Sequence, residues 1–370
     1  MKTESNEREC SYIKEIPFET FYINDKAAYK TTTIELNGLN SYSQLVDLFF
    51  HPKESLGEQF YSIFPKDIRY SSHHNMLLDN SDFRPWNGWV FRGQKQADWK
   101  LSSSLERLIL NKNEYHKKNL WNIEKGIIRN FRRSSGAFFP EINDIPENEY
   151  YQFMAHLQHF GDATRFLDVT YSFFVALFFA TNSIELKTSD EDEKDKNRFF
   201  SIWCFDRAWI EKRYKDFLPY RIKKLYKQDT FGKNVKTQEA VLNYAPNLEN
   251  KKEGSSNKAL AVINMNPYYF NTRLSRQKGS FLFPLNPFRS FEDNLFNMVG
   301  DKDENAWRIL KIDVQYDNNL LIHLKKLLDS MNINNFTLFE NLDGMCRDIN
   351  SRVFFHDDSI TTPIKGGVRS

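Results

Sequence analysis

Residues 156–180 read HLQHFGDATRFLDVTYSFFVALFFA, and this stretch decides how the chain is organised. The chain from Ser172 to about Asn182, which is the second half of this stretch and the two residues after it, is apolar on nearly every side. Such a pattern is typical of a buried helix. Upstream, apolar residues recur at helical spacing at Tyr150, Phe153, Met154 and Leu157. Pro146 suits the first turn of that helix and Gly161 suits its end. The stretch therefore predicts two helices joined by a polar connection.

The polar connection carries Thr164, Arg165 and Asp168. Thr170 or Asp168 can cap the second helix by accepting its free N–H groups. Arg165 can pair with Asp168, or with another carboxylate, through its two-pronged guanidinium. Two interpretations stay open: a buried polar network that fixes the two helices, or a binding site.

A second candidate site is Phe91-Arg92-Gly93-Gln94, at the end of the β-rich run that starts at Trp89. The run predicts a strand closed by glycine, where the missing Cβ lets a ligand approach the backbone. An arginine there suits a phosphate or a carboxylate. The alternative is an arginine in a salt bridge at a strand edge.

Around these two sites, strands and helices intermingle without a regular βαβ rhythm, which favours an α+β fold. Further strands are expected at residues 31–39, 199–205, 259–264, 280–283 and 308–314, and further helices at residues 105–132, from Ser41, around 320–328 and from Thr337. We predict a single elaborated domain with a mixed, mostly antiparallel core sheet flanked by helices.

Composition excludes several classes of protein. The 370 residues are 40% hydrophobic and 15% aromatic, which excludes a disordered or collagen-like chain. A formal charge of +2 gives no strong global attraction to DNA or to an anionic membrane. The longest apolar run, Phe173–Ala180, is too short to span a bilayer, and residues 1–10 lack the apolar stretch of a signal peptide. We therefore expect a cytoplasmic protein without membrane contact.

Metal and phosphate motifs are absent from the sequence. The three cysteines, Cys10, Cys204 and Cys346, have no zinc-binding spacing and fit a reducing compartment. His156 and His159 lie three residues apart, but no H-E-x-x-H pattern supports a metal site. Polar histidines with satisfied hydrogen bonds are favoured, and no metal is expected. The sequence also contains no G-x-G-x-x-G, Walker A or G-x-S-x-G motif.

Two charged segments stand out. Residues 185–198 are a solvent loop or a flexible insertion. Residues 211–236 carry nine Lys/Arg against three Asp/Glu, a local charge of about +6, with aromatic residues interleaved. This pattern suits base stacking and phosphate contacts, or equally an amphipathic helix with a solvated lysine face. Glu185-Leu186-Lys187 is an E-x-K triplet that keeps a nuclease as a minor alternative.

Four blocks of sequence resemble the FRG domain family. The first is WVFRGQKQADWKLSSSLER (residues 89–107), and the second is QHFGDATRFLDVTYSFFVALFFA (158–180). The third is RQKGSFLFP (276–284), and the fourth is TLFENLDGMCRDI (337–349). In the second block Ala163 stands where the family usually has proline, Phe166 replaces a leucine, and Val169 replaces a tryptophan. Members of the family occur in bacteria and phages, and several are associated with anti-phage defence.

The order of the blocks also resembles ADP-ribosyltransferases. In that resemblance Arg92 corresponds to an arginine on the first core strand that binds the NAD phosphates, and residues 168–170 correspond to a strand edge that leads into a helix. The third block places Arg276 and Gln277 near the usual position of a catalytic glutamate, which is a departure because neutral glutamine supplies no charge for an oxocarbenium-like state. A carboxylate must then come from elsewhere, the candidates being Asp168, Glu292, Glu340 and Asp343, or the site only binds.

The resemblance implies an NAD-type nucleotide as substrate, with ADP-ribosyl transfer or NAD cleavage in a toxin-like defence effector. The expected catalytic residues are Asp168, Gln277 and Asp343. The expected nucleotide- and substrate-binding residues are Arg92, Gly93, Gln94, Gln158, His159, Thr164, Arg165, Thr170 and Arg276. The alternatives are a non-enzymatic sensor or adaptor that binds a protein target, a phage trigger or, through residues 211–236, nucleic acid, and the nuclease.

Domain boundaries follow from the blocks. We expect an N-terminal helical or irregular extension over residues 1–85 and an FRG-like domain over residues 86–350. The domain includes the charged insertion 185–198 and the basic segment 211–236. A C-terminal tail covers residues 351–370.

Overall fold

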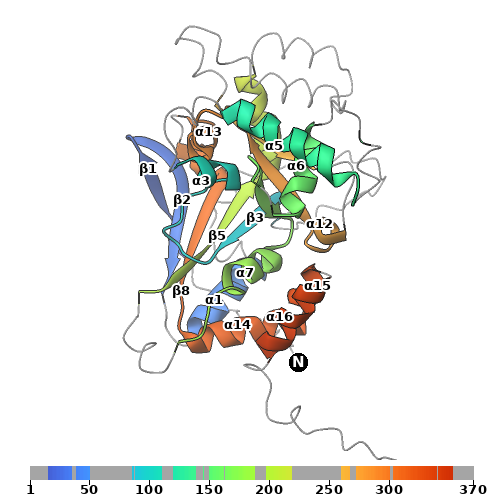
Figure 1. The fold of residues 1–370 in the computed structure, drawn as a ribbon. Coiled ribbons are helices and arrows are strands. Elements are labelled where there is room, and N and C mark those ends of the chain that lie inside the picture. Colours follow the sequence, from blue (N-terminus) through green and yellow to red (C-terminus); the bar gives the residue numbers. More distant parts are fainter. Residues whose placement is uncertain are drawn as a thin grey trace, which may run out of the picture.

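A computed structural model describes the chain over residues 16–35, 39–50, 86, 88–110, 120–138, 145, 150–161, 163–187, 197–218, 260–266, 272–300, 303–339 and 341–352. These residues form one α+β domain in which helices flank an eight-stranded mixed sheet (Figure 1), as predicted. Among them, no helix has both the length and the apolar character needed to cross a membrane.

The sheet has the strand order β1-β2-β8-β5-β3-β4-β7-β6. Every neighbouring pair is antiparallel except β2 and β8, which are parallel. The strands are β1 (Glu19–Ile23), β2 (Lys26–Ile34), β3 (Trp89–Gln94), β4 (Leu167–Thr170), β5 (Phe199–Asp206), β6 (Val262–Met265), β7 (Gly279–Pro284) and β8 (Ile309–Gln315). The N-terminal region thus contributes two strands to the same sheet as the rest of the chain.

Apolar side chains on both faces of the central strands explain why helices cover both sides of the sheet. The helices are α1 (Leu39–Phe50), α3 (Ser104–Leu110), α5 (Leu120–Ser135), α6 (Tyr150–His159), α7 (Phe173–Thr181), α9 (Arg207–Arg213), α12 (Thr272–Arg276), α13 (Phe291–Phe296), α14 (Asn318–Ser330), α15 (Asn335–Phe339) and α16 (Leu342–Arg352), with 3₁₀ turns η2 (Tyr214–Phe217) and η5 (Asp303–Arg308). Helices α1, α7 and α14 pack on one face, and α9 and α13 pack on the other. Helices α5 and α6 pack on the aromatic side chains of β7.

Helix α7 is the apolar helix that the sequence predicts, and it lies directly against β3. Figure 1 shows it crossing the centre of the domain in front of the sheet. Its cap differs from the prediction: the N-cap is Ser172, whose side chain accepts a hydrogen bond from the Val175 N–H, so the prediction of Thr170 or Asp168 is wrong. Thr170 and Asp168 instead belong to β4, a strand too short to show a period of two.

Gly93 makes the close approach of α7 and β3 possible. A Cβ atom at this position would lie 1.9 Å from the carbonyl oxygen of Ala176 and 2.6 Å from the backbone nitrogen of Ala180. The sequence analysis explained the missing Cβ of Gly93 by the approach of a ligand. This explanation needs correction, because the missing Cβ makes room for the backbone of α7. The Phe91 ring packs edge-on against Phe173 in the same contact.

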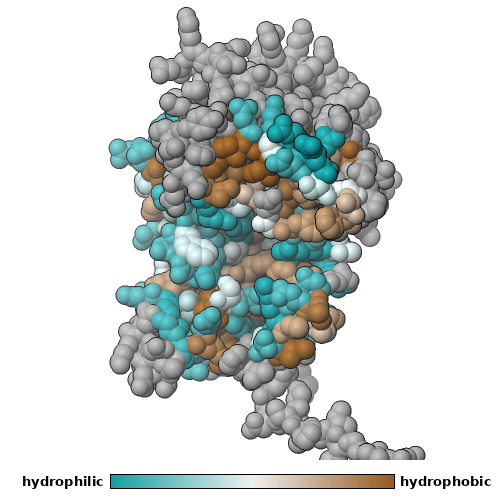
Figure 2. Space-filling view, in the orientation of Figure 1, coloured by the Kyte–Doolittle hydropathy of each residue, from teal (hydrophilic) through white to brown (hydrophobic). Residues whose placement is uncertain are grey.

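Apolar side chains also remain on the surface. They are visible as brown atoms over α15 and α16 at the bottom of Figure 2, where Phe336, Leu342 and Ile349 are each more than half exposed. A second brown area lies in the upper centre of the same view, bordered by teal hydrophilic surface (Figure 2).

We predict that Gly93→Ala lowers the free energy of unfolding by about 3 kcal/mol or more, because the backbone of α7 must move to admit the new methyl group. Chemical denaturation monitored by circular dichroism measures the change. The matched control is Gly126→Ala on α5, where a Cβ atom would meet nothing within 4 Å. That change should be neutral or stabilising by up to about 1 kcal/mol, since alanine favours a helix over glycine. Equal effects of the two changes would contradict the packing argument.

Candidate functional site

The two halves of the sheet meet at a single residue pair. Strand β3 pairs with β5 along its whole length, and β4 pairs with β7 along its whole length. Between β3 and β4, the register contains only Phe91 opposite Thr170. Beyond that pair an arginine side chain takes the place of the backbone ladder, since Arg92 Nη1 donates to the carbonyl oxygen of Asp168 at 2.8 Å. The strands therefore separate where the two sequence-predicted sites face each other.

A cavity of about 260 Å³ lies at this separation. It is lined by Phe91, Arg92, Gly93, Gln158, Asp168, Val169, Thr170, Phe179, Arg273, Leu274, Gln277, Gly279 and Ser280. A smaller hollow of about 30 Å³ shares Gln158, Asp168, Arg273 and Gln277 with the cavity and adds His159. The structure thus brings together residues from three of the four sequence blocks.

Arg92 supplies a positive charge with unused hydrogen-bonding capacity. Its Nε atom is buried and has no hydrogen-bond partner among the described residues. Burial lowers the pKa of Arg92, and the nearby charge of Asp168 opposes this shift. An arginine starts from a pKa far above neutrality, so the guanidinium stays charged. A buried donor without a partner is costly, and an anionic ligand in the cavity can satisfy it.

Arg273, on α12, is a second guanidinium at the cavity. Its Nη1 donates to the carbonyl oxygen of His159 at 3.0 Å, and its Cζ lies 4.9 Å from the centre of the Phe339 ring. Burial lowers its pKa, and Asp168 opposes this shift as well. The sequence reasoning missed this residue because it precedes the third block. The feature of the sequence that could have identified Arg273 was its position four residues before Gln277.

Among the described residues that line the cavity, Asp168 is the only one with a carboxylate. Its side chain is exposed, and its Oδ2 atom accepts a hydrogen bond of 2.7 Å from Gln158 Nε2. Both guanidiniums at the cavity interact electrostatically with it. An accessible carboxylate between two cations suits a ligand that carries both anionic and hydroxyl groups.

Thr170 and Gln277 form the wall between β4 and α12. The Thr170 hydroxyl donates to the backbone oxygen of Gln277 at 2.7 Å. The Gln277 side chain donates to the carbonyl oxygen of Leu338 on α15 at 3.2 Å. These bonds fix Gln277 at the cavity, so the third and fourth blocks meet here.

His159 lies at the hollow rather than in the main cavity, and its side chain is half-buried. Burial lowers its pKa, and the charges of Arg273 and His156 lower it further. The imidazole is therefore neutral at physiological pH. Within the described residues, no group of three or more His, Cys, Asp and Glu side chains is arranged to hold a metal.

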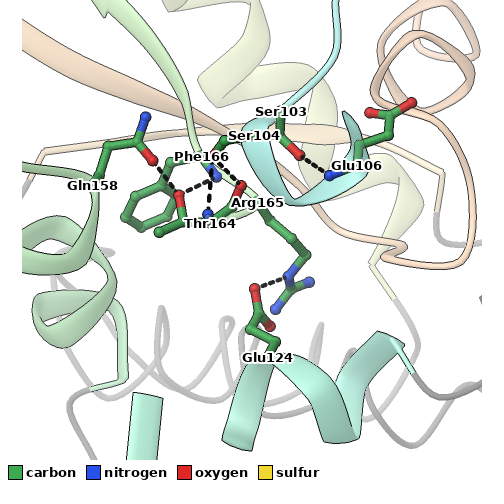
Figure 3. A network of polar contacts seen from close by, with 8 residues as sticks. All are labelled: Ser103, Ser104, Glu106, Glu124, Gln158, Thr164, Arg165 and Phe166. Atoms are coloured by element: carbon green, nitrogen blue, oxygen red, sulfur yellow. Dashed lines mark hydrogen bonds and ion pairs between the residues drawn. The ribbon is translucent and has the colours of Figure 1, made fainter. Parts of the chain in front are cut away.

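Thr164 and Arg165 do not line the cavity but support it (Figure 3). Arg165 points away from Gln158 and pairs with Glu124 on α5, with 2.7 Å between Nε and Oε1. Both side chains are almost completely buried, and the Arg165 guanidinium also stacks on Phe283. The partner of Arg165 is therefore Glu124 rather than Asp168, and sequence reasoning could not select it because it lies 41 residues upstream.

Four other expected or candidate residues also lie outside the cavity lining. Gln94 is buried and accepts a hydrogen bond from Trp203 Nε1. Arg276 is exposed and contacts the carbonyl oxygen of Thr337. Asp343 is exposed on α16 in an ion pair with Arg347, and Glu292 accepts the Leu101 N–H.

Glu340, the remaining candidate carboxylate, lies outside the described residues. Of the five candidate carboxyl or amide groups proposed for catalysis, the structure thus places Asp168 and Gln277 at the cavity.

The basic segment 211–236 lies outside the described residues from position 219 onwards. In its described part Tyr214 is buried, and Phe217 packs against the same core and under the Arg213 guanidinium. These two aromatic rings therefore belong to the protein interior rather than to a stacking surface. The charged insertion is described only at its ends, where the backbone of Lys187 is hydrogen-bonded to Asn318 of α14.

Comparison with known protein families places residues 87–189 in the FRG domain family. This protein carries an FRG domain. Comparisons with curated proteins and with solved structures found no match. The matched segment of the FRG domain contains Arg92, Gly93, Gln158, Asp168 and Thr170, which form one side of the cavity.

The rest of the cavity lining comes from residues beyond the matched segment of the FRG domain. Arg273 and Gln277 lie on or just after α12, and Gly279 and Ser280 begin β7. The cavity therefore depends on the later part of the chain as much as on the FRG segment itself.

We predict that Arg165 acts through folding. Glu124→Leu should lower the free energy of unfolding by about 3–5 kcal/mol, because it leaves a buried guanidinium without its carboxylate. The double change Glu124→Leu with Arg165→Met should recover most of that loss, since it removes both charges. Urea denaturation measures both variants.

The control is Asp343→Leu, which removes the exposed partner of Arg347 on α16. An exposed pair contributes at most about 1 kcal/mol, so this change should have little effect. A double variant no more stable than Glu124→Leu would contradict a structural ion pair.

Proposed function

We propose that the FRG domain of this protein binds an NAD-type nucleotide in the cavity between β3 and β4 and cleaves its bond between ribose and nicotinamide. The observation that carries the proposal is the convergence of two guanidiniums, Arg92 and Arg273, with one accessible carboxylate, Asp168, on a single cavity. Charged groups of opposite sign at one concave site are typical of a ligand-binding site rather than of a packed core.

Arg92 is the residue best suited to the diphosphate. Its Nε donor has no partner among the described residues, and its charge is held at the gap between the strands by the bond to Asp168 O. Arginine forms paired, charge-assisted hydrogen bonds to phosphate oxygens. Arg273 adds a second positive charge, restrained by the Phe339 ring. This arrangement binds an anion without having to move first.

Asp168 is the residue best suited to the sugar. Loss of nicotinamide leaves positive charge on the ribose ring, and a nearby carboxylate stabilises that charge in the transition state. The missing glutamate of the third block leaves this role to another residue, and Asp168 is the carboxylate that lines the cavity. Gln277 and Thr170 flank it from α12 and β4 and would hold the ribose hydroxyls.

The acceptor is either water, which gives NAD cleavage, or a nucleophile on a protein target, which gives ADP-ribosyl transfer. The family resemblance adds a biological setting: an effector that consumes NAD after a phage component activates it. Loss of NAD would make such a protein toxin-like for the infected cell.

Asp168→Asn should reduce NAD turnover by at least about a hundredfold, because it removes the charge that stabilises the transition state. Release of nicotinamide from labelled NAD, measured with and without phage lysate, checks this. Asp343→Asn is the matched control, since that carboxylate is exposed and paired with Arg347 away from the cavity. Absence of turnover and of transferred label in the wild-type protein under all conditions would refute the enzymatic proposal.

Arg92→Gln should weaken the binding of ADP-ribose at least about tenfold while leaving the melting temperature within a few degrees, because the change removes a charged partner of the diphosphate. Isothermal titration calorimetry measures the affinity. Arg276→Gln is the control, because Arg276 belongs to the third sequence block but is exposed and outside the cavity lining. Equal losses in both variants would point to general surface charge instead of a site.

A further inference from the structure

A chain of hydrogen bonds leads from the backbone of Phe166 to the carboxylate of Asp168. The Phe166 N–H donates to Thr164 Oγ1 at 3.1 Å. The Thr164 hydroxyl donates to Gln158 Oε1, and Gln158 Nε2 donates to Asp168 Oδ2 at 2.7 Å. Figure 3 shows the first two of these bonds, with the amide oxygen of Gln158 turned towards Thr164.

The chemistry of its two ends gives this chain a fixed direction. A backbone N–H can only donate, so Thr164 Oγ1 must accept at one end. An ionised carboxylate can only accept, so Gln158 must present Nε2 to Asp168 at the other end. The amide oxygen then faces Thr164, whose hydroxyl hydrogen is available to it. A flipped amide would place its oxygen against the carboxylate and lose the bond to Asp168.

We infer that Thr164 and Gln158 are positioning residues that hold the carboxylate of Asp168 in one orientation, with Oδ2 occupied and Oδ1 left for the ligand. Among the described residues no hydrogen bond reaches Oδ1, and Asp168 lines the cavity. The catalytic meaning of this arrangement rests on the proposed function. The hydrogen-bond chain and its effect on the carboxylate do not depend on it.

The side chain and the backbone of Thr164 have separate tasks, which allows the inference to be tested. The backbone of Thr164 attaches α3: its N–H donates to Ser104 Oγ, and its carbonyl oxygen accepts from the Leu105 N–H and from Ser104 Oγ. These bonds survive any change of the side chain. The hydroxyl is used for the contacts with Phe166 N and Gln158.

The test compares Thr164→Val, which removes the hydroxyl at nearly constant volume, with Thr164→Ser, which keeps it. Infrared difference spectra of protein labelled with ¹³C at the aspartate carboxyl groups follow the carboxylate stretching bands, and subtraction of Asp168→Asn assigns the band of Asp168. In Thr164→Val this band should shift in frequency, because the hydrogen-bond donor to Oδ2 is no longer held in place. Thr164→Ser should give the wild-type band.

A second variant covers the case in which Thr164→Val does not fold. Gln158→Met removes the donor itself at a half-buried position and should shift the same carboxylate band. An unchanged band in Gln158→Met, or in a folded Thr164→Val, would overturn the inference.

Turnover separates this inference from the proposed function. If NAD is cleaved, Thr164→Val should lower kcat about tenfold with KM nearly unchanged, and Thr164→Ser should keep the wild-type kcat. If the wild-type protein does not cleave NAD but the carboxylate band shifts as expected, the proposed function fails and the positioning role stands. A lower kcat with an unchanged carboxylate band, and with equal loss in Thr164→Ser, would contradict the positioning role and indicate a merely structural effect.

Discussion

The contact between α7 and β3 is the constraint on which the rest of the structure depends. A helix that is buried on nearly every side must be surrounded by apolar elements, and here it lies so close to the strand that Gly93 has no space for a Cβ atom. This contact fixes β3 from one face while β5 fixes it along one edge. The other edge of β3 pairs with β4 at a single residue pair, and beyond it the two strands separate. The cavity exists because the strands on either side of it are each held firmly by other partners.

The electrostatics of the cavity follow from this separation. Once the backbone ladder between the strands stops, polar groups at the gap need other partners. Arg92 satisfies the carbonyl oxygen of Asp168, and Gln158 satisfies one oxygen of its carboxylate. Among the residues that the structure describes, Arg92 Nε and Asp168 Oδ1 have no hydrogen-bond partner. A site for an anion and a hydroxyl group therefore arises from incomplete strand pairing rather than from a separate binding loop.

The sequence predicts the fold class and most of the strands because β5 is a compact run of mostly apolar residues and β8 alternates apolar with polar ones. The prediction fails where the pattern is short or solvent-exposed. Strand β1 belongs to an exposed hairpin whose only signal is Asn24-Asp25, both with positive φ. Strand β4 has four residues. For the site, the family blocks identify Arg92, Asp168 and Gln277, but they also include Thr164, Arg165 and Gln94, which lie outside the cavity lining. A buried polar side chain and an exposed one can occupy the same sequence motif. Only the contacts with α5 and β5 show that Arg165 and Gln94 are buried away from the cavity.

Helix α12 shows that the segment matched to the FRG family is shorter than the part of the chain that forms the cavity. The side chains of Arg273, Arg276 and Gln277 all end on α15, through the Phe339 ring and the carbonyl oxygens of Thr337 and Leu338. Helix α15 in turn is joined to α7 by the paired amides of Asn182 and Asn335. The far wall of the cavity is therefore anchored to the FRG segment through residues some 150 positions later in the chain. A fragment cut at the borders of the family match would keep Arg92 and Asp168 and lose the surface that faces them.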